Sequence, residues 1–486
     1  MVLEHQTGLS DAGYQTQSKR PLSHLPTEII TEIFLNVCDR PILPRTSPNS
    51  SRKTSIVYPL FLGKICKEWR RVAWKCPLLW NVIHIPLSLR KYGQQLILLQ
   101  EWVARSADCP LSIYLEMHDG EGLWRGTDFL RGLFSLLVEH SDRWENIDIF
   151  LPKPSKGVLS AACLRVPLLR SASIRALNSV DVPLEFLESS PSLRSLELKR
   201  ISPKGVDCQN LTRLVASFVS TADLVYTLQA APNLQYCELG NTYGTPDSHP
   251  ILHFSLPFLR VLKLRNCHSS ALLPHFGIAP QLEDLEISEW NDHLDLDAMS
   301  TFLGRTQSSL QSFTIATGDS LNRDDLRDLL KELDTVTSLE IQYLYVRDDT
   351  QVFRPFLKMF DSEESQVSKD EPLCEDTNVT DLTVEHTKSS TFLPSLRELR
   401  YQLPLNTEET DLEKLVTVVI KRWNDGIPMR EYKRDRSRER FARLETLRFD
   451  PSISTSQILD PLRKEMEEGL KIIFDLPFVD SGGEDS

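Results

Sequence analysis

The sequence lacks the features that define several large classes of protein. Its nine cysteines are odd in number and form no CxxC pair, which argues against a disulfide scaffold and favours a reducing compartment. No stretch approaches about eighteen uninterrupted apolar residues, so we expect no membrane span. The first twenty residues contain no apolar core segment, so we also expect no secretory signal. Together these absences predict an intracellular protein, cytoplasmic or nuclear.

Motifs of catalysis and metal binding are also missing. The sequence has no GxxxxGK[ST], no GxGxxG after a strand, no GxSxG and no HExxH. The histidines from His249 to His268 have no cysteine or carboxylate at metal-ligand spacing, so a solvated loop is the favoured interpretation. The acids from Asp324 to Asp328 and those of 361–376 fit a helix start and a loop better than a metal cage. We therefore predict a protein without catalytic residues, cofactor or metal.

Net charge makes nucleic acid a poor candidate partner. The formal charge is −13 at pH 7, whereas binding to phosphates requires clustered cations. The one basic run, Arg430 to Arg443, could be a nuclear-import or phosphate-contacting patch. Because Glu431, Asp435 and Glu439 are interleaved with its cations, we favour a solvated insertion.

Two helical patterns lie between residues 21 and 85. Pro26 can open the first helix, because a first-turn N–H has no partner within a helix. Apolar residues then recur at steps that gather them on one side of each helix. They are Ile29, Ile30, Ile33, Phe34 and Val37 in the first pattern, and Leu62, Ile65, Cys66, Trp69, Val72 and Ala73 in the second.

The order of these residues resembles an F-box. That family has a Leu-Pro opening, an acidic residue before two aliphatics, an Ile-Phe pair, an aliphatic-Cys step, a Trp and a closing Leu-Trp. Here these features are Leu25-Pro26, Glu28-Ile29-Ile30, Ile33-Phe34, Ile65-Cys66, Trp69 and Leu79-Trp80. The chain departs from the pattern at 41–55, a Pro-, Ser- and Arg-rich insertion similar to those of fungal F-box proteins, which we interpret as a solvated loop.

The resemblance implies a docking module without catalysis of its own. In that family the Leu-Pro turn and the first helix pack against a Skp-family adaptor, which binds a cullin. The implied function is the substrate receptor of an SCF-type ubiquitin ligase, which presents a bound protein for ubiquitination and proteasomal degradation. The alternative is a ligase-independent repeat scaffold that only pairs with the adaptor. The implied adaptor-binding residues are Leu25, Pro26, Ile29, Ile30, Ile33, Phe34, Ile65 and Trp69.

From about residue 140 onward the chain repeats a short strand-like unit. Its first leucines, such as Leu193, Leu211 and Leu234, lie roughly 18 to 28 residues apart, the period of leucine-rich repeats. Alternation puts the leucines on one face of each strand and the intervening residue, such as Glu197 or Lys263, on the other. The units are 143–149, 167–174, 191–198, 209–216, 232–239, 257–264, 280–287, 308–315, 335–341, 378–384, 394–401 and 442–449.

Helical segments are predicted between many of these strands. No single repeat can bury its own apolar side, so stacking must stabilise the array. The predicted helices are 182–188, 221–230, 296–305, 322–333 and 411–423, preceded by helices at 90–106 and 129–139.

The whole sequence therefore predicts an α/β protein: an N-terminal three-helix F-box followed by a solenoid similar to irregular leucine-rich repeats, with parallel strands and helical or irregular connections. Stacked repeats present an extended concave surface, on which we expect an unidentified protein substrate. We expect neither nucleic acid nor membrane as a partner. The predicted divisions are a disordered tail (1–20), the F-box (21–85), a linker helix with a first strand (86–139), the array (140–450) with loops at 361–376 and 424–440, a capping helix (451–478) and a tail (479–486).

Overall fold

In the computed structural model, the chain divides into two compact units. One unit comprises Met1–Ile83 and Gly93–Leu111, and the other comprises His84–Tyr92 and Ser112–Ser486. The residues that the structure describes are 25–38, 59–87, 91–117, 128–151, 165–180, 184–244, 253–290, 294–306, 310–317, 323–343, 354, 356–360, 392–402, 408–428, 441–449 and 455–474. The predicted tails, the insertion at 41–55, the loop at 361–376, most of the loop at 424–440 and the strand at 378–384 lie outside them.

The first unit is built from short helices whose starts are set by single residues. Pro26 is the N-cap of the first helix, and its carbonyl accepts a hydrogen bond from the Ile30 N–H at 3.2 Å. Cys66 caps the third helix, since its Sγ accepts the Trp69 N–H at 3.4 Å. The elements are α1 (Thr27–Val37), α2 (Pro59–Ile65), α3 (Lys67–Lys75), η1 (Pro77–Leu79) and α4 (Tyr92–Arg105).

Tryptophans form the core of this unit. The Trp80 ring lies 5.2 Å from that of Trp74 and 4.9 Å from that of Trp102, centroid to centroid, both near edge-on. The Arg105 guanidinium lies about equally far from Trp74 and Trp80, at 5.1 and 5.0 Å. Trp80 Nε1 donates to the Ala73 carbonyl at 2.8 Å, so its one polar atom is satisfied in the core. These contacts fix most of α4 to the N-terminal helices rather than leaving it as a linker.

The strands of the described residues form one sheet in sequence order. The sheet has fourteen strands, and the neighbouring pairs from β3 to β14 are parallel. The α/β class with a parallel sheet is thus confirmed. The strands are β1 (Val82–Leu87), β2 (Leu111–Met117), β3 (Trp144–Leu151), β4 (Ser171–Val180), β5 (Ser195–Ile201), β6 (Arg213–Ser217), β7 (Tyr236–Gly240), β8 (Val261–Arg265), β9 (Asp284–Glu289), β10 (Ser312–Thr317), β11 (Ser338–Tyr343), β12 (Glu398–Tyr401), β13 (Thr446–Phe449) and β14 (Lys471–Phe474).

From β5 to β13 consecutive strands pair without a register shift, which stacks their apolar residues into two continuous rows. In each strand from β5 to β13 the two leucine-type positions of the predicted unit are buried, and the residue between them is not. The rows contain Leu196 and Leu198, Leu214 and Ala216, Cys237 and Leu239, Leu262 and Leu264, Leu285 and Ile287, Phe313 and Ile315, Leu339 and Ile341, Leu399 and Tyr401, and Leu447 and Phe449.

The first leucine of each predicted unit closes a turn before its strand. The N–H of Leu211 donates to the Cys208 carbonyl at 3.1 Å, and the N–H of Leu259 donates to the Leu256 carbonyl at the same distance. Between repeats, the Arg260 N–H donates to the Gln235 carbonyl at 2.9 Å, one rung of a ladder that recurs along the array. Backbone groups at the turns are therefore satisfied by the next repeat, which explains why repeats must stack.

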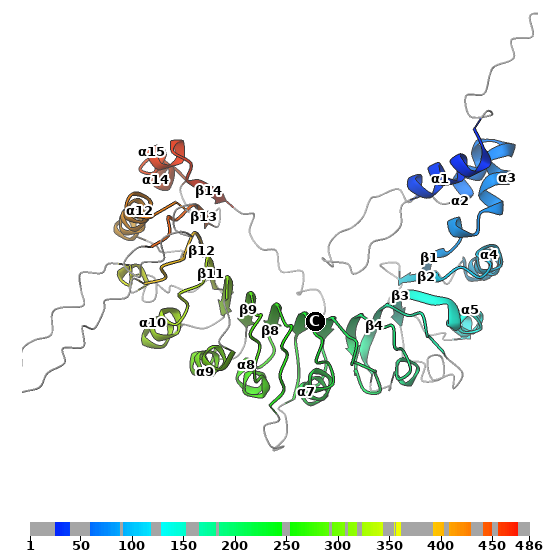
Figure 1. The fold of residues 1–486 in the computed structure, drawn as a ribbon, viewed down its shortest axis with the longest axis horizontal. Coiled ribbons are helices and arrows are strands. Elements are labelled where there is room, and N and C mark those ends of the chain that lie inside the picture. The colour runs from blue at the N-terminus through cyan, green and yellow to red at the C-terminus, as the bar shows by residue number, and fades with distance from the viewer. Residues whose placement is uncertain are drawn as a thin grey trace, which may run out of the picture. The chain divides into compact units, whose positions relative to one another are not determined.

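Helices lie along one side of the sheet, as Figure 1 shows for α7, α8, α9 and α10. The helices predicted at 221–230, 296–305, 322–333 and 411–423 are confirmed within one or two residues at most ends. In the predicted helix 182–188, the described residues 184–188 contain a 3-10 turn instead. The elements are α5 (Asp128–Val138), η3 (Ser141–Arg143), η4 (Glu185–Leu187), α7 (Thr221–Gln229), α8 (Ser269–Leu272), η5 (Leu273–His275), α9 (Leu296–Thr306), α10 (Arg323–Lys331) and α12 (Glu409–Asn424).

The predicted C-terminal capping helix is wrong in its second half. The structure has two short helices, α14 (Thr455–Leu459) and α15 (Arg463–Glu467), followed by strand β14. Gly469 has a φ of +122°, a backbone conformation that ends the helix and that side chains disfavour. The apolar residues after it pair with β13, Leu447 opposite Ile472 and Phe449 opposite Phe474.

Candidate functional site

Helix α1 is apolar on two sides, but only one side is buried. Ile30 and Phe34 are 3% and 1% exposed, and the Phe34 ring lies 4.9 Å from the half-buried Trp69 ring, centroid to centroid. These residues hold the helices of the first unit together. Because successive helical residues are rotated by about 100°, Ile29 and Ile33 lie on a different side of α1.

Ile29 and Ile33 on this side, with Leu25 just before the helix and Val37 in its last turn, form an exposed apolar stripe. Its members follow at steps of four residues and keep between about a third and a half of their surface in solvent. They are Leu25 (37% exposed), Ile29 (49%), Ile33 (39%) and Val37 (46%), and they are called the α1 stripe from here on. Exposed aliphatic residues in such a row are unusual on a protein without a partner, and they mark interaction surfaces.

The predicted adaptor-binding residues therefore divide into two groups. Leu25, Pro26, Ile29, Ile33 and Ile65 are exposed and available for contact. Ile30 and Phe34 are buried, and Trp69 lies between the two groups, partly covered by Phe34.

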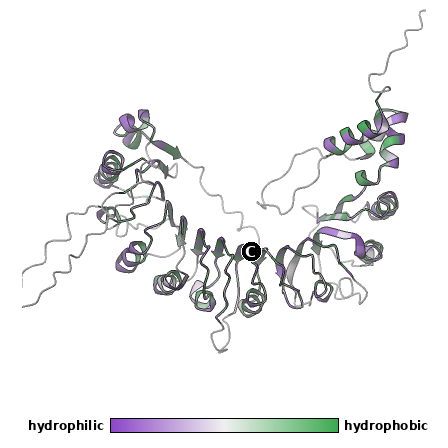
Figure 2. Ribbon diagram, in the orientation of Figure 1, coloured by the Kyte–Doolittle hydropathy of each residue, from purple (hydrophilic) through white to green (hydrophobic). Residues whose placement is uncertain are grey.

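Helix α2 carries exposed apolar residues, of which the sequence predicted only Ile65 as a contact residue and missed Leu60 and Phe61. Phe61 is 58% exposed and Ile65 is 51% exposed, and their spacing of four residues puts them on one side of α2. Leu60 beside them is also exposed. Figure 2 shows hydrophobic segments on these helices. The four-residue spacing of Phe61 and Ile65 could have predicted this exposed side of α2. The helical pattern was instead assigned through Leu62 and Trp69, and it left Phe61 out.

The second candidate surface is the face of the sheet opposite the helices, called the open face from here on. Its positions are the ones between and beside the buried leucine-type positions, such as Glu238 between Cys237 and Leu239. Over strands β4 to β13 no helix of the described residues lies on it (Figure 1). The predicted outward positions, Glu197 and Lys263, lie there.

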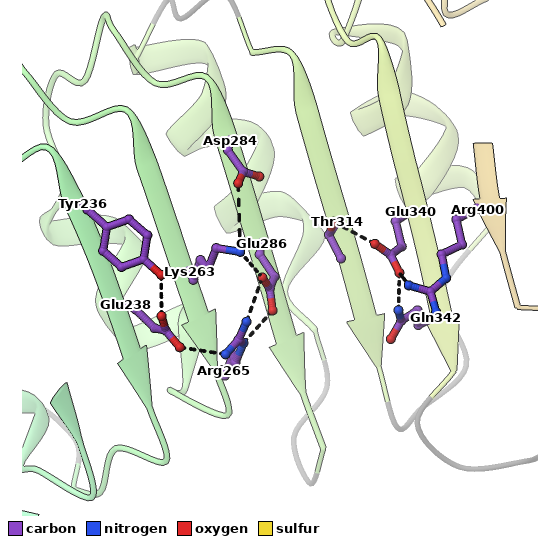
Figure 3. Close-up of polar contacts among 10 residues, drawn as sticks. All are labelled: Tyr236, Glu238, Lys263, Arg265, Asp284, Glu286, Thr314, Glu340, Gln342 and Arg400. Carbon is purple, nitrogen blue, oxygen red and sulfur yellow. Dashed lines mark hydrogen bonds and ion pairs between the residues drawn. The ribbon is translucent and has the colours of Figure 1, made fainter. Parts of the chain in front are cut away.

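Charged side chains on the open face form networks that cross strands (Figure 3). Arg265 on β8 bonds Glu238 on β7 at 2.7 Å and Glu286 on β9 at 2.6 Å. Lys263 also bonds Glu286, at 2.9 Å, and the Tyr236 hydroxyl donates to Glu238 at 2.5 Å. The network thus ties three consecutive strands together.

A second network on the open face joins β10, β11 and β12. Arg400 bonds Glu340 at 2.5 Å, and Gln342 donates to the same carboxylate. The Thr314 hydroxyl reaches Glu340 at 3.5 Å (Figure 3).

Two carboxyls of the open face have pKa values shifted in opposite directions. Burial raises the pKa of Glu197 above its ordinary value, and the charges of Arg175 and Arg213 offset this only in part. For Glu286, burial also acts to raise the pKa, but the hydrogen bonds and charges of Arg265 and Lys263 outweigh it and lower the pKa below the ordinary value.

Other site types have no counterpart in the described part of the chain. No group of three or more His, Cys, Asp or Glu there could hold a metal ion, although His249 lies outside that part. None of its helices has both the length and the apolar character needed to cross a membrane.

Comparison of the sequence with protein-family models found no matching family, and comparison with curated proteins found no significant match. The surfaces themselves are therefore the basis of the functional argument.

Proposed function

We propose that this protein is the substrate receptor of an SCF-type ubiquitin ligase. In this proposal the first unit is an F-box that docks a Skp-family adaptor, and the adaptor links the chain to a cullin. The sheet of the second unit is a leucine-rich-repeat solenoid whose open face holds a protein substrate. The chain contributes no reacting group and acts by holding the substrate near the conjugating enzyme.

The observation that carries the proposal is the α1 stripe. It starts at Leu25-Pro26, just before α1, where the F-box resemblance expects adaptor contact, and it continues through Ile29 and Ile33 to Val37 in the last turn of the helix. Burying an aliphatic side chain of this size contributes about 1.5 to 3 kcal/mol. A partner that covers the four stripe residues would therefore gain a substantial part of its affinity from them.

Co-expression of the full chain with a Skp-family adaptor, followed by pull-down, tests the proposal. The test variant is Ile29→Ser with Ile33→Ser, which removes the centre of the stripe without touching the buried Phe34. Loss of two interface anchors of this kind lowers affinity by about tenfold to a thousandfold. We expect the wild-type chain to retain the adaptor and the double variant to lose it.

Ile97→Ser is the matched control. Ile97 is 64% exposed on α4, so it removes the same kind of side chain from the same unit outside the stripe. Retention of the adaptor by this control, with unchanged thermal melting of both variants, supports docking through the stripe. If the wild-type chain does not bind the adaptor, the ligase proposal fails, and a repeat protein that acts without the ligase remains.

A further inference from the structure

Charges on the open face are not evenly distributed along the array. Strands β4 to β8 carry five cations and two carboxylates at their described open-face positions. The cations are Arg175, Lys199, Arg213, Lys263 and Arg265, and the carboxylates are Glu197 and Glu238. Arg175 is ion-paired with Asp148 on β3, Lys263 with Glu286 on β9, and Arg265 with both Glu238 and Glu286. Counted over β4 to β8 alone, this part of the face has more cations than carboxylates, although the whole chain has a formal charge of −13. It is called the cationic strip from here on.

The charge at the open-face positions is negative on the next three strands. The charged side chains at the open-face positions of β9, β10 and β11 are Asp284, Glu286 and Glu340, all acidic. Glu286 on β9 is ion-paired with Lys263 and Arg265 on the neighbouring strand β8, so the acidic part of the face begins directly at the edge of the strip.

Aromatic rings hold several of the cations of the strip in place. The Arg213 guanidinium lies 4.2 Å from the centre of the Tyr236 ring, and the Lys199 ammonium lies 5.7 Å from that of Phe218. Arg200, which follows Lys199, lies 4.5 Å from the same Phe218 ring. Stacking of this kind orders a long side chain before a partner arrives, which lowers the entropic cost of binding.

One of these cations has unused bonding capacity. Arg213 Nη1 is buried and has no hydrogen-bond partner in the described part of the chain. A buried donor without a partner costs about 1 to 3 kcal/mol, so a change of rotamer that brought Nη1 to a bound carboxylate would recover this.

The floor of the strip leaves room between the cations. Gly240 and Ser217 lie side by side in the row that runs from Lys199 to Arg265. A Cβ added at Gly240 would meet only the Ser217 Cβ at 3.6 Å and the Arg265 carbonyl oxygen at 3.9 Å. Small residues therefore let a backbone approach the sheet between two cations.

We propose that the cationic strip binds an extended, Asp- and Glu-rich segment of the substrate protein. The inference rests on the proposed function in one respect, because it names the class of protein that the receptor holds. The cations are spread over four strands (β4, β5, β6 and β8) rather than gathered at one point, so they match several single carboxylates along a peptide. From β4 to β8 the strip spans about 19 Å, the length of about six extended residues.

The acids of β9 to β11 limit the length and orientation of this segment. An acidic peptide that continued past β8 would be repelled by Glu286 and Glu340. The peptide, or at least its run of Asp and Glu residues, must therefore end there. Repulsion of this kind is how interfaces exclude wrong partners and fix register.

Fluorescence anisotropy of labelled peptides on the full chain tests the inference. The probes are alternating Glu-Ser, Gln-Ser and Lys-Ser peptides of equal length. We expect the Glu-Ser peptide to bind, more weakly as NaCl rises, and the other two to bind at least tenfold more weakly. The double variant Lys199→Gln, Arg213→Gln should bind the Glu-Ser peptide at least about tenfold more weakly, since each cation makes charge-assisted hydrogen bonds.

Two matched variants separate the strip from general charge effects. Arg260→Gln removes an exposed cation that precedes β8 and pairs with Glu283, outside the strip, and should leave binding unchanged. Glu340→Gln removes an acid beyond β8 and should leave binding equal or tighter. Equal binding of the Glu-Ser and Lys-Ser peptides overturns the inference, and so does an equal loss in Arg260→Gln and the strip variant.

The same samples distinguish this inference from the proposed function. Each preparation is also tested for adaptor binding, which the strip variant should leave intact, and for an unchanged melting temperature. If the adaptor binds but the Glu-Ser peptide does not, the inference alone fails. If the peptide binds but the adaptor does not, the ligase proposal fails and the acidic-peptide site stands.

Discussion

Glu286 and Glu197 occupy equivalent positions on strands of the same face, yet their environments push their pKa values apart. The pKa of Glu286 is below its ordinary value because the hydrogen bonds and charges of Arg265 and Lys263 outweigh the effect of burial. Such a group stabilises the fold at pH values above its unfolded-state pKa, and this stabilisation is lost as pH falls through the lower folded-state pKa.

We therefore expect Glu286→Gln to lower the free energy of unfolding at pH 7 by about 1 to 3 kcal/mol, the value of hydrogen bonds to a charged group. The loss should shrink as the pH falls through the acidic range. Glu197→Gln is the contrast, because burial raises the pKa of Glu197. The carboxyl stabilises the fold only below its unfolded-state pKa, and this stabilisation is lost as pH rises through the folded-state pKa. Relative to the wild-type chain, Glu197→Gln should therefore increase the free energy of unfolding more at pH 7 than at acidic pH.

Urea unfolding of the three proteins across acidic to neutral pH checks both signs. A parallel pH dependence for the two variants would contradict the assignment of opposite environments to the two carboxyls.

Three buried cysteines of the array, Cys237 in the stacked rows and Cys208 and Cys267 beside the strands, should be chemically inert in the folded protein. Burial raises the pKa of the Cys208 thiol and that of the Cys267 thiol, each to about 12, and it raises that of Cys237 as well. Only the thiolate reacts with alkylating agents, so these three should resist iodoacetamide at pH 8 until the chain is unfolded. Mass spectrometry of peptides before and after unfolding in urea measures this, and rapid native labelling of Cys237 would show that its row is not packed.

At the scale of the element, the buried residues of α1 should determine stability, and its exposed residues should determine binding. Phe34→Ala removes a buried ring and should cost about 3 to 5 kcal/mol of unfolding free energy. Ile29→Ser removes a side chain that is half exposed and should cost less than about 1 kcal/mol. Chemical unfolding of the two variants gives the comparison. Equal destabilisation would mean that the α1 stripe is part of the core and not a docking surface.

Arg422 on α12 joins segments that lie far apart in the sequence. Its side chain is buried, and its guanidinium lies 4.9 Å from the Phe360 ring centre and 4.8 Å from that of Phe441. Its Nη1 donates to the Leu393 carbonyl at 2.9 Å, and its Nη2 donates to the carbonyl of Phe392.

Arg422→Met should therefore destabilise the fold by about 2 to 4 kcal/mol, because two backbone carbonyls lose charged donors. The neighbouring Lys421→Met removes an exposed cation from the same helix and should change stability by less than about 0.5 kcal/mol. Thermal or urea unfolding distinguishes the two, and similar curves would show that the Arg422 contacts contribute nothing.

The sequence predicted most elements of the array because two local patterns, the alternation of apolar residues and the leucine before each strand, indicate the same elements. The alternation in units such as 257–264 defines both the strand and its buried face, and the leucine before it defines the turn. The same logic failed at 457–474, since an apolar stretch after Gly469 can continue a helix or join a sheet edge. Only the unpaired edge of β13 decides that choice, and no local pattern reveals it.

The candidate site was less predictable for a related reason. Ile29, Ile30, Ile33 and Phe34 are all apolar, and the sequence does not say which side of α1 meets Trp69. The structure makes that distinction. The cationic strip was equally hidden, because Arg175, Arg213 and Arg265 are far apart in the sequence and meet only through the constant register of the strands.

At the scale of the whole molecule, the proposals give the two compact units different tasks. In them the first unit would dock an adaptor through the α1 stripe, and the second would bind an acidic segment of a substrate through the cationic strip. Each surface depends on one unit only, so a variant in one should leave binding at the other intact. That independence is what a receptor joining two partners requires.

Hydrogen–deuterium exchange of the full chain, with and without a Skp-family adaptor, tests the central claim most directly. Adaptor binding should slow exchange in residues 25–37, which contain the α1 stripe, and leave β4 to β8 unchanged. Unchanged exchange at 25–37 in the presence of bound adaptor, or protection confined to the sheet, would contradict the assignment of the stripe as the docking surface.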